Sequence, residues 1–286
     1  MKKLLIVLFL CVTTVGITMW ALEWPAAPTQ LITTFGANER GFPHLGISFD
    51  TSNDILSSGN GELIFNSETK LSRFISPLGT WKAIDHGEGL ISIYSRFAPD
   101  NDSAALTTVQ SGTVIGSAGR SGWSQRQGFH FSLYDRKGRH WSNPSLLLPP
   151  VADTQAPIIQ SVRLRNQAGT FFELLPMRRI PQGSYAIVVN ASDTVDQNTR
   201  LLTPISIRCF VNGTEIGVLT FETIFEQDGI LMIQQHVPTP LATVYAPFPS
   251  FEIAQYRFDR GLATIEVLAR DMQGGTRNVT FTVIIE

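Results

Sequence analysis

Residues 112–131 constrain the fold of this chain more than any other stretch, because glycines recur through their first half every three or four residues. Such spacing breaks a helix, and each glycine permits backbone angles that few other residues adopt. The four glycines are Gly112, Gly116, Gly119 and Gly122. The pattern predicts a tight turn, a short apolar strand and a loop, followed by a strand that carries one histidine, His130.

The remainder of residues 22–150 is typical of an all-β fold. Short alternating or apolar runs are separated by glycine, serine, asparagine and aspartate, and none has a convincing period of 3.6 residues. We therefore predict a mostly antiparallel sheet domain in this region. The chain has 286 residues and a hydrophobic content of 43%, which is ample for packed cores and suggests two domains.

Three runs within residues 30–144 resemble the motifs of lysostaphin-type, or LytM-like, zinc endopeptidases. The opening motif of that family, His-x-Gly-Ile-Asp, is similar to the run from His44 to Ser48. Its Thr-x-Tyr-x-His strand is similar to the run from Ser92 to Arg96, and its last strand, His-x-His-Phe-Glu, is similar to the run from Gly128 to Ser132. The glycine spacing before the last strand and a closing Asn143-Pro144 pair also match, so the resemblance implies a LytM-like scaffold.

The resemblance implies a zinc site that has lost one ligand. His44 and His130 stand where the family has zinc-binding histidines, and Ser48 stands where it has an aspartate. Residues four apart on a strand share a face, so His44 and Ser48 keep the spacing of a ligand pair. A neutral hydroxyl is a poor replacement for a carboxylate on zinc. We expect no cofactor, with zinc bound only under the alternative that the chain is an active peptidase.

Both positions of the catalytic imidazoles are changed as well. Arg96 and Gly128 occupy them, and Ser132 replaces the glutamate of the last motif. A guanidinium stays protonated at any useful pH, so Arg96 is unable to act as a general base. We predict an inactive homologue of a peptidoglycan zinc metalloendopeptidase, in which the changes Ser48→Asp, Arg96→His and Gly128→His together restore zinc affinity if the backbone keeps the family geometry. The candidates for a binding groove are His44, Ser48, Arg96 and His130.

Residues 151–286 are predicted to form a second domain, an immunoglobulin-like (Ig-like) β-sandwich. A proline-punctuated linker at residues 146–157 precedes about seven apolar or alternating runs. Asn212-Gly213 predicts a hairpin, and Gly274-Gly275 predicts a second turn. The segment Asp153 to Pro157, Asp-Thr-x-Ala-Pro, resembles the start of bacterial Ig-like modules of cell-wall proteins. No group of acidic residues has the spacing of a calcium loop, and we predict no catalytic or metal site here.

Residues 1–21 predict export, either as a signal peptide or as an N-terminal anchor. Lys2 and Lys3 precede an apolar run of about 17 residues, which is typical of a signal peptide and reaches the lower limit for a membrane span. Without these two lysines 20 of the 22 basic residues remain against 24 acidic ones, a balance that argues against nucleic acid as a partner. Cys209 is the one cysteine outside residues 1–21. It lies in an apolar run and is predicted to be a buried side chain without a disulfide.

Three functions are compatible with these patterns. In the first, a non-catalytic LytM-like protein of the periplasm or cell envelope binds peptidoglycan or a cell-wall hydrolase and regulates cell-wall remodelling. In the second, both β domains form a structural or adhesion scaffold of the envelope. In the third, the chain is an active zinc endopeptidase that cleaves peptidoglycan peptides. Contact with a membrane is expected only through an uncleaved N-terminal segment.

Overall fold

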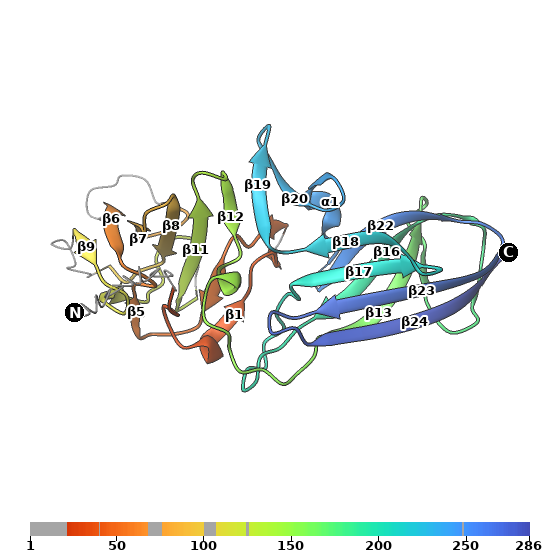
Figure 1. Ribbon diagram of the computed structural model, residues 1–286, viewed down its shortest axis with the longest axis horizontal. Coiled ribbons are helices and arrows are strands. Elements are labelled where there is room, and N and C mark those ends of the chain that lie inside the picture. The colour runs from red at the N-terminus through yellow and green to blue at the C-terminus, as the bar shows by residue number, and fades with distance from the viewer. Residues whose placement is uncertain (1–21, 40, 68–75, 100–106, 124–125, 248) are drawn as a thin grey trace, which may run out of the picture.

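The computed structural model describes residues 22–39, 41–67, 76–99, 107–123, 126–247 and 249–286. The predicted signal peptide or anchor at residues 1–21 lies outside this part of the chain. Within the described ranges no helix is both long enough and apolar enough to cross a membrane. Among the described residues, the strands pair antiparallel except for one short parallel pair. The chain is nearly all β, which confirms the predicted fold class (Figure 1).

The first half of the described chain consists of short strands and two 3-10 helices. Their bounds are η1 (Pro28–Gln30), β1 (Leu31–Thr33), β2 (Asn38–Glu39), β3 (Phe42–Pro43), β4 (Ile47–Phe49), β5 (Asp54–Leu56), β6 (Gly61–Asn66), β7 (Trp81–Asp85), β8 (Leu90–Ser95), β9 (Thr108–Val109), β10 (Val114–Ser117), β11 (Phe129–Asp135), β12 (His140–Ser142) and η2 (Pro144–Leu146). Strands β12, β11, β8, β7, β6 and β9 follow one another across one sheet. Strand β8 lines one edge of β11, whereas β4 and β12 share the other edge.

Strand β11 is the central element of this sheet, and its sequence alternates as a half-buried strand does. Phe129, Phe131 and Leu133 are fully buried in the core of the first half. Because successive side chains of a strand point to opposite faces, His130 and Ser132 lie on the other face. The apolar residues thus fix the register that places the histidine of the last motif.

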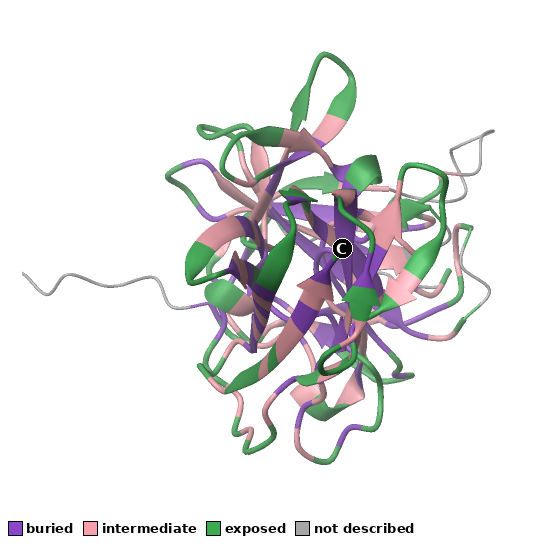
Figure 2. Ribbon diagram, turned by 90° about the vertical axis from the view of Figure 1, so that its right-hand side faces the viewer, coloured by how far each residue is buried: buried purple, intermediate pink, exposed green. Residues whose placement is uncertain are grey.

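The second half forms two sheets that pack face to face. Its elements are β13 (Ile158–Asn166), β14 (Phe171–Glu173), β15 (Arg179–Ile180), β16 (Gly183–Ser192), β17 (Ser206–Val211), β18 (Thr214–Thr220), β19 (Thr223–Gln227), β20 (Ile230–Gln234), β21 (Pro238–Pro240), α1 (Leu241–Val244), β22 (Ser250–Phe258), β23 (Gly261–Arg270) and β24 (Thr276–Ile285). One sheet has the order β14-β13-β16-β22 and the other β15-β24-β23-β17-β18. Buried residues of both sheets make one core, which occupies the interior in Figure 2.

Strand pairing joins the two halves. Strands β19, β20 and β21 leave the sandwich, and β19 pairs antiparallel with β12, so that residues of the second half extend the sheet of the first (Figure 1). Phe35, Leu45 and Trp141 of the first half pack into or against the sandwich core. The boundary at residue 150 stays a prediction, but the halves on either side of it share both a sheet and a core.

Hydrogen bonds also hold the predicted linker and the neighbouring loops in place. The Trp24 indole donates to the carbonyl of Pro149 at 2.8 Å, and Leu148 is buried in the core of the first half. The side chain of Asn198, itself buried, donates to the carbonyl of Leu31 at 2.7 Å. The segment between the halves is therefore packed and hydrogen-bonded rather than a free tether.

Local predictions in the second half are confirmed where they rest on turn chemistry. Asn212 and Gly213 both have positive φ and connect β17 to β18. Gly274 has a φ of 93° in the turn from β23 to β24. Cys209 is fully buried and forms no disulfide.

Candidate functional site

The structure brings together four side chains from two paired strands. His44 precedes β4 and Ser48 lies within it, while His130 and Ser132 lie two residues apart on β11. Antiparallel pairing places Ser48 directly opposite His130. We call these four residues the histidine–serine cluster. The pairing of β4 with β11 thus brings His130 next to Ser48.

The Ser48 hydroxyl lies between the two imidazoles. Its Oγ is 3.1 Å from Nε2 of His44 and 3.2 Å from Nδ1 of His130. The other ring nitrogen of His130, Nε2, is 2.7 Å from Oγ of Ser132. The two rings meet edge to face, with centroids 4.6 Å apart. A side chain at Gly46 would prevent this approach, because a Cβ there would lie 2.2 Å from the carbonyl oxygen of Phe131.

These contacts form one directional chain of hydrogen bonds. A hydroxyl carries one proton, so Ser48 donates to one imidazole and accepts from the other. If Nε2 of His44 donates to Ser48, then Ser48 donates to His130 and His130 donates to Ser132; the opposite direction reverses every donor. Both arrangements satisfy all three contacts with neutral imidazoles. The cluster is therefore a satisfied polar network at a largely buried position.

Electrostatics keep His130 neutral. Burial, then the neighbouring His44 and then Arg96, lower the pKa of His130 well below its ordinary value. Arg96 follows β8 with a left-handed backbone (φ 73°), held by a bond from its N–H to the carbonyl of Leu78 at 3.0 Å. The positive charge of its guanidinium is the smallest of the three causes that lower the pKa of His130. A cation there opposes a metal ion as well as a protonated imidazole.

The residues present do not fit a zinc centre. Zinc sites in proteins use three or four donors from cysteine, histidine and carboxylate side chains. In the part of the chain that the structure describes, neither His44 nor His130 belongs to a group of three or more such donors. The third position holds the neutral hydroxyl of Ser48, which already bonds both imidazoles. The site therefore lacks the carboxylate that the resembled family uses as a zinc ligand.

The position of the second catalytic imidazole is closed by the backbone. Gly128 has a φ of 132°, a region that L side chains rarely adopt, and a Cβ there would lie 1.9 Å from the carbonyl oxygen of Phe49. Two hydrogen bonds with Gly119 hold it in this conformation. The sequence shows that a histidine is absent here, but it does not show that the backbone conformation excludes any side chain with a Cβ. The predicted triple change depended on a backbone that keeps the family geometry, and at Gly128 this backbone leaves no room for a histidine.

The sheet thus carries a pair of histidines with an incomplete set of zinc ligands. Residues 42–144 match the model of Peptidase family M23, so this domain is of the M23 type and the lysostaphin-type resemblance is confirmed. A second family model matches residues 156–286. Among curated proteins, none matches the chain in sequence.

Several solved structures are similar to the chain at low identity. The antimicrobial peptidase lysostaphin from Staphylococcus simulans is 16% identical, and the match covers 71% of this chain and 81% of that one with a TM-score of 0.36. A structure of the SpoIIQ–SpoIIIAH pore-forming complex is 16% identical over 46% of this chain and 92% of that one, with a TM-score of 0.37. A zinc-containing peptidase from Vibrio cholerae is 21% identical over 41% of this chain and 37% of that one, with a TM-score of 0.34.

Proposed function

We propose that the chain is an exported, non-catalytic M23-type protein of the periplasm or cell envelope. In this proposal it binds peptidoglycan or a cell-wall hydrolase and regulates cell-wall remodelling, and its second half serves as an Ig-like module. The observation that carries the proposal is the Ser48 hydroxyl, which bonds both His44 and His130 at the place where a peptidase needs an anionic zinc ligand. The family match supports the connection to the cell wall.

The scaffold and peptidase alternatives make different demands on the same cluster. An active peptidase needs a third protein donor for zinc and a base for the attacking water, and Ser48 and Arg96 supply neither. A pure scaffold needs no cation beside the cluster. Arg96 directly follows β8, the strand that pairs with β11, and its positive charge is the smallest of three causes that lower the pKa of His130. This favours recognition of an anionic ligand over a purely structural role.

The decisive experiment is co-sedimentation of the purified protein with insoluble peptidoglycan, together with elemental analysis of the same preparation. We expect retention on peptidoglycan or, in a parallel pull-down, on a purified cell-wall hydrolase. We also expect no stoichiometric zinc and no cleavage of peptide cross-links. One zinc per chain with chelator-sensitive cleavage would establish the peptidase alternative. A metal-free protein that binds neither target would leave the scaffold alternative.

Arg96→Ala is expected to weaken binding to peptidoglycan stem peptides by about 1.5–3 kcal/mol, roughly 10-fold to more than 100-fold, the range for hydrogen bonds to charged groups. A guanidinium offers a planar fork that binds a carboxylate through two hydrogen bonds, so Arg96→Lys is expected to recover only part of the loss. The same Arg96→Ala change is expected to raise the pKa of His130, because it removes a positive charge that opposes the imidazolium.

Calorimetric titration measures the affinity, and NMR titration of the imidazole measures the pKa. Arg136→Ala is the matched control, because that arginine lies in the turn after β11 with a side chain 64% exposed, and its guanidinium is 3.7 Å from the Asp85 carboxylate. It is expected to change neither quantity. Unchanged affinity in a folded Arg96→Ala variant would remove this residue from recognition.

A further inference from the structure

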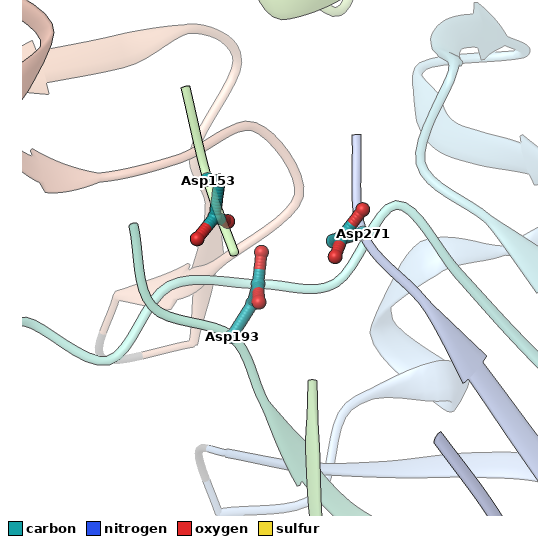
Figure 3. A group of neighbouring side chains, drawn as sticks. All are labelled: Asp153, Asp193 and Asp271. Atoms are coloured by element: carbon teal, nitrogen blue, oxygen red, sulfur yellow. The ribbon is translucent and has the colours of Figure 1, made fainter. Parts of the chain in front are cut away.

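Three aspartates from separate segments of the second half converge at the end of the sandwich nearest the M23 domain. Asp153 lies in the segment before β13, Asp193 directly follows β16, and Asp271 directly follows β23. One carboxylate oxygen of each lies within 4.8 Å of the others. Figure 3 shows the three side chains facing one another. The group was missed in the sequence because its members are about 40 and 80 residues apart and form no local motif.

Two of these carboxylates keep an oxygen that has no hydrogen-bond partner. Asp193 is 5% exposed, and its Oδ1 is buried and unpaired. Oδ2 of Asp153 is buried and unpaired as well. Figure 3 shows the carboxylate of Asp193 pointing into the space between Asp153 and Asp271. Buried polar atoms in native proteins are almost always satisfied, so these oxygens point to a ligand.

The third carboxylate is held rigidly in the position of a ligand. Oδ1 of Asp271 accepts hydrogen bonds from the backbone N–H groups of Gln273 and Gly275, each at 2.8 Å. A Cβ at Gly275 would lie 2.2 Å from Oδ2 of Asp271, so the glycine leaves room for this carboxylate. The turn from β23 to β24 thus fixes the side chain before any ligand arrives.

The three carboxylates have no basic partner in the part of the chain that the structure describes. Among the described residues, none of the ion pairs includes Asp153, Asp193 or Asp271. Burial, with smaller contributions from Asp271 and Asp153, raises the pKa of Asp193 to about 7. Burial is also the main cause of the raised pKa of Asp153. The cluster therefore lacks a positive charge.

We propose that Asp153, Asp193 and Asp271 bind one calcium ion. All three donors are carboxylate oxygens, which hard divalent cations prefer, and no thiolate or imidazole is in the group. Calcium takes oxygen ligands at about 2.3–2.6 Å, so a single ion spans oxygens up to about 5 Å apart. A pocket of about 250 Å³, lined in part by Asp193 and Gln273, gives water access to complete the coordination shell.

The position of the ion assigns it a mechanical role. Asp193 directly follows a strand of one sheet and Asp271 directly follows a strand of the other, whereas Asp153 belongs to the segment that leads from the M23 domain. A bound calcium ion links all three and fixes that segment to both sheets. The site is independent of the histidine–serine cluster, so it stands whether or not the M23 domain binds peptidoglycan.

The test is thermal unfolding of the full chain after treatment with a chelator, with and without millimolar CaCl2, together with calorimetric titration of calcium. At concentrations well above the dissociation constant we expect one calcium per chain and a rise of roughly 5–10 °C in the unfolding midpoint. We expect Asp153→Asn, Asp193→Asn and Asp271→Asn each to lose most of this rise. Asp153 is only half-buried, so its variant keeps the test independent of folding defects.

Asp228→Asn is the matched control, because Asp228 is an exposed aspartate of the same half, in the turn between β19 and β20. It is expected to keep the full calcium-dependent rise. Absence of a rise in the unaltered protein, or an equal rise in Asp153→Asn and Asp193→Asn, would refute the site. A larger rise with MgCl2 than with CaCl2 would refute the assignment to calcium.

Discussion

Gly128→His is expected to lower the free energy of unfolding by about 3 kcal/mol or more, although it restores the histidine that the family motif has at this position. The loss has two causes. The φ of 132° at Gly128 is costly for any residue with a Cβ, and that Cβ would lie 1.9 Å from the carbonyl oxygen of Phe49 on the neighbouring strand β4. Relief of the clash has to move β4 away from β11, and this movement separates Ser48 from His130.

Chemical denaturation measures this loss of stability. Two alanine variants separate the contribution of the steric clash from that of the backbone conformation. Gly128→Ala is expected to lose nearly as much as Gly128→His, because the Cβ alone causes the clash. Gly213→Ala, in the turn between β17 and β18, has a φ of 79° but no atom within 4 Å of the added Cβ. It is expected to show backbone strain alone, about 1–2 kcal/mol. A folded Gly128→His variant within about 1 kcal/mol of the unaltered protein would contradict the steric argument.

The same geometry changes how a metal site is best engineered into this chain. The triple change Ser48→Asp, Arg96→His and Gly128→His restores a zinc ligand but also introduces a backbone clash. Failure of this variant to bind zinc would therefore not show whether the restored ligands are sufficient. The double change Ser48→Asp and Arg96→His leaves Gly128 intact. It replaces the bridging hydroxyl with a carboxylate and removes the guanidinium charge, and so it isolates the question of the ligands.

Two features of the histidine–serine cluster follow from local sequence patterns. The alternation of Phe129, Phe131 and Leu133 sets which face of β11 carries His130, and the spacing of His44 and Ser48 sets the facing pair. The hydrogen bonds of Ser48 depend instead on the orientation of the two imidazole rings and on how closely they approach the hydroxyl. These follow from the packing around Gly46, which residue types alone do not specify.

Contacts between distant segments limited the sequence prediction of the fold in the same way. The hairpin at Asn212-Gly213 has a local turn signal, and it was predicted. The pairing of β19 with β12 joins residues more than 80 positions apart, and an edge strand carries no mark of its partner. Asp153, Asp193 and Asp271 meet only because three chain segments end at the same place. Such long-range encounters follow from the assembled sheets rather than from any short pattern.

Phe221→Ala is expected to cost about 3–5 kcal/mol and to loosen the junction between the two halves. The Phe221 side chain is fully buried, and its ring packs 5.4 Å from that of Phe251 in the sandwich core. The ring also fills the space over Gly36 of the first half, where an added Cβ would lie 2.0 Å from Cδ1 of Phe221. Its carbonyl accepts a hydrogen bond from the buried side chain of Asn143 at 2.8 Å. One phenyl ring therefore contributes to both halves at once.

Two measurements separate lost stability from lost coupling. Denaturation gives the free energy of unfolding. Limited proteolysis at residues 146–157 reports on the junction, because Pro149 of that segment is hydrogen-bonded to the first half and Thr154 to the second. Phe171→Ala is the matched control, because Phe171 lies in the same sandwich with 46% of its surface exposed. It is expected to cost less than about 1 kcal/mol and to leave proteolysis unchanged. Cleavage at the same rate in Phe221→Ala and the unaltered protein would show that the shared sheet between β12 and β19 holds the halves together without this ring.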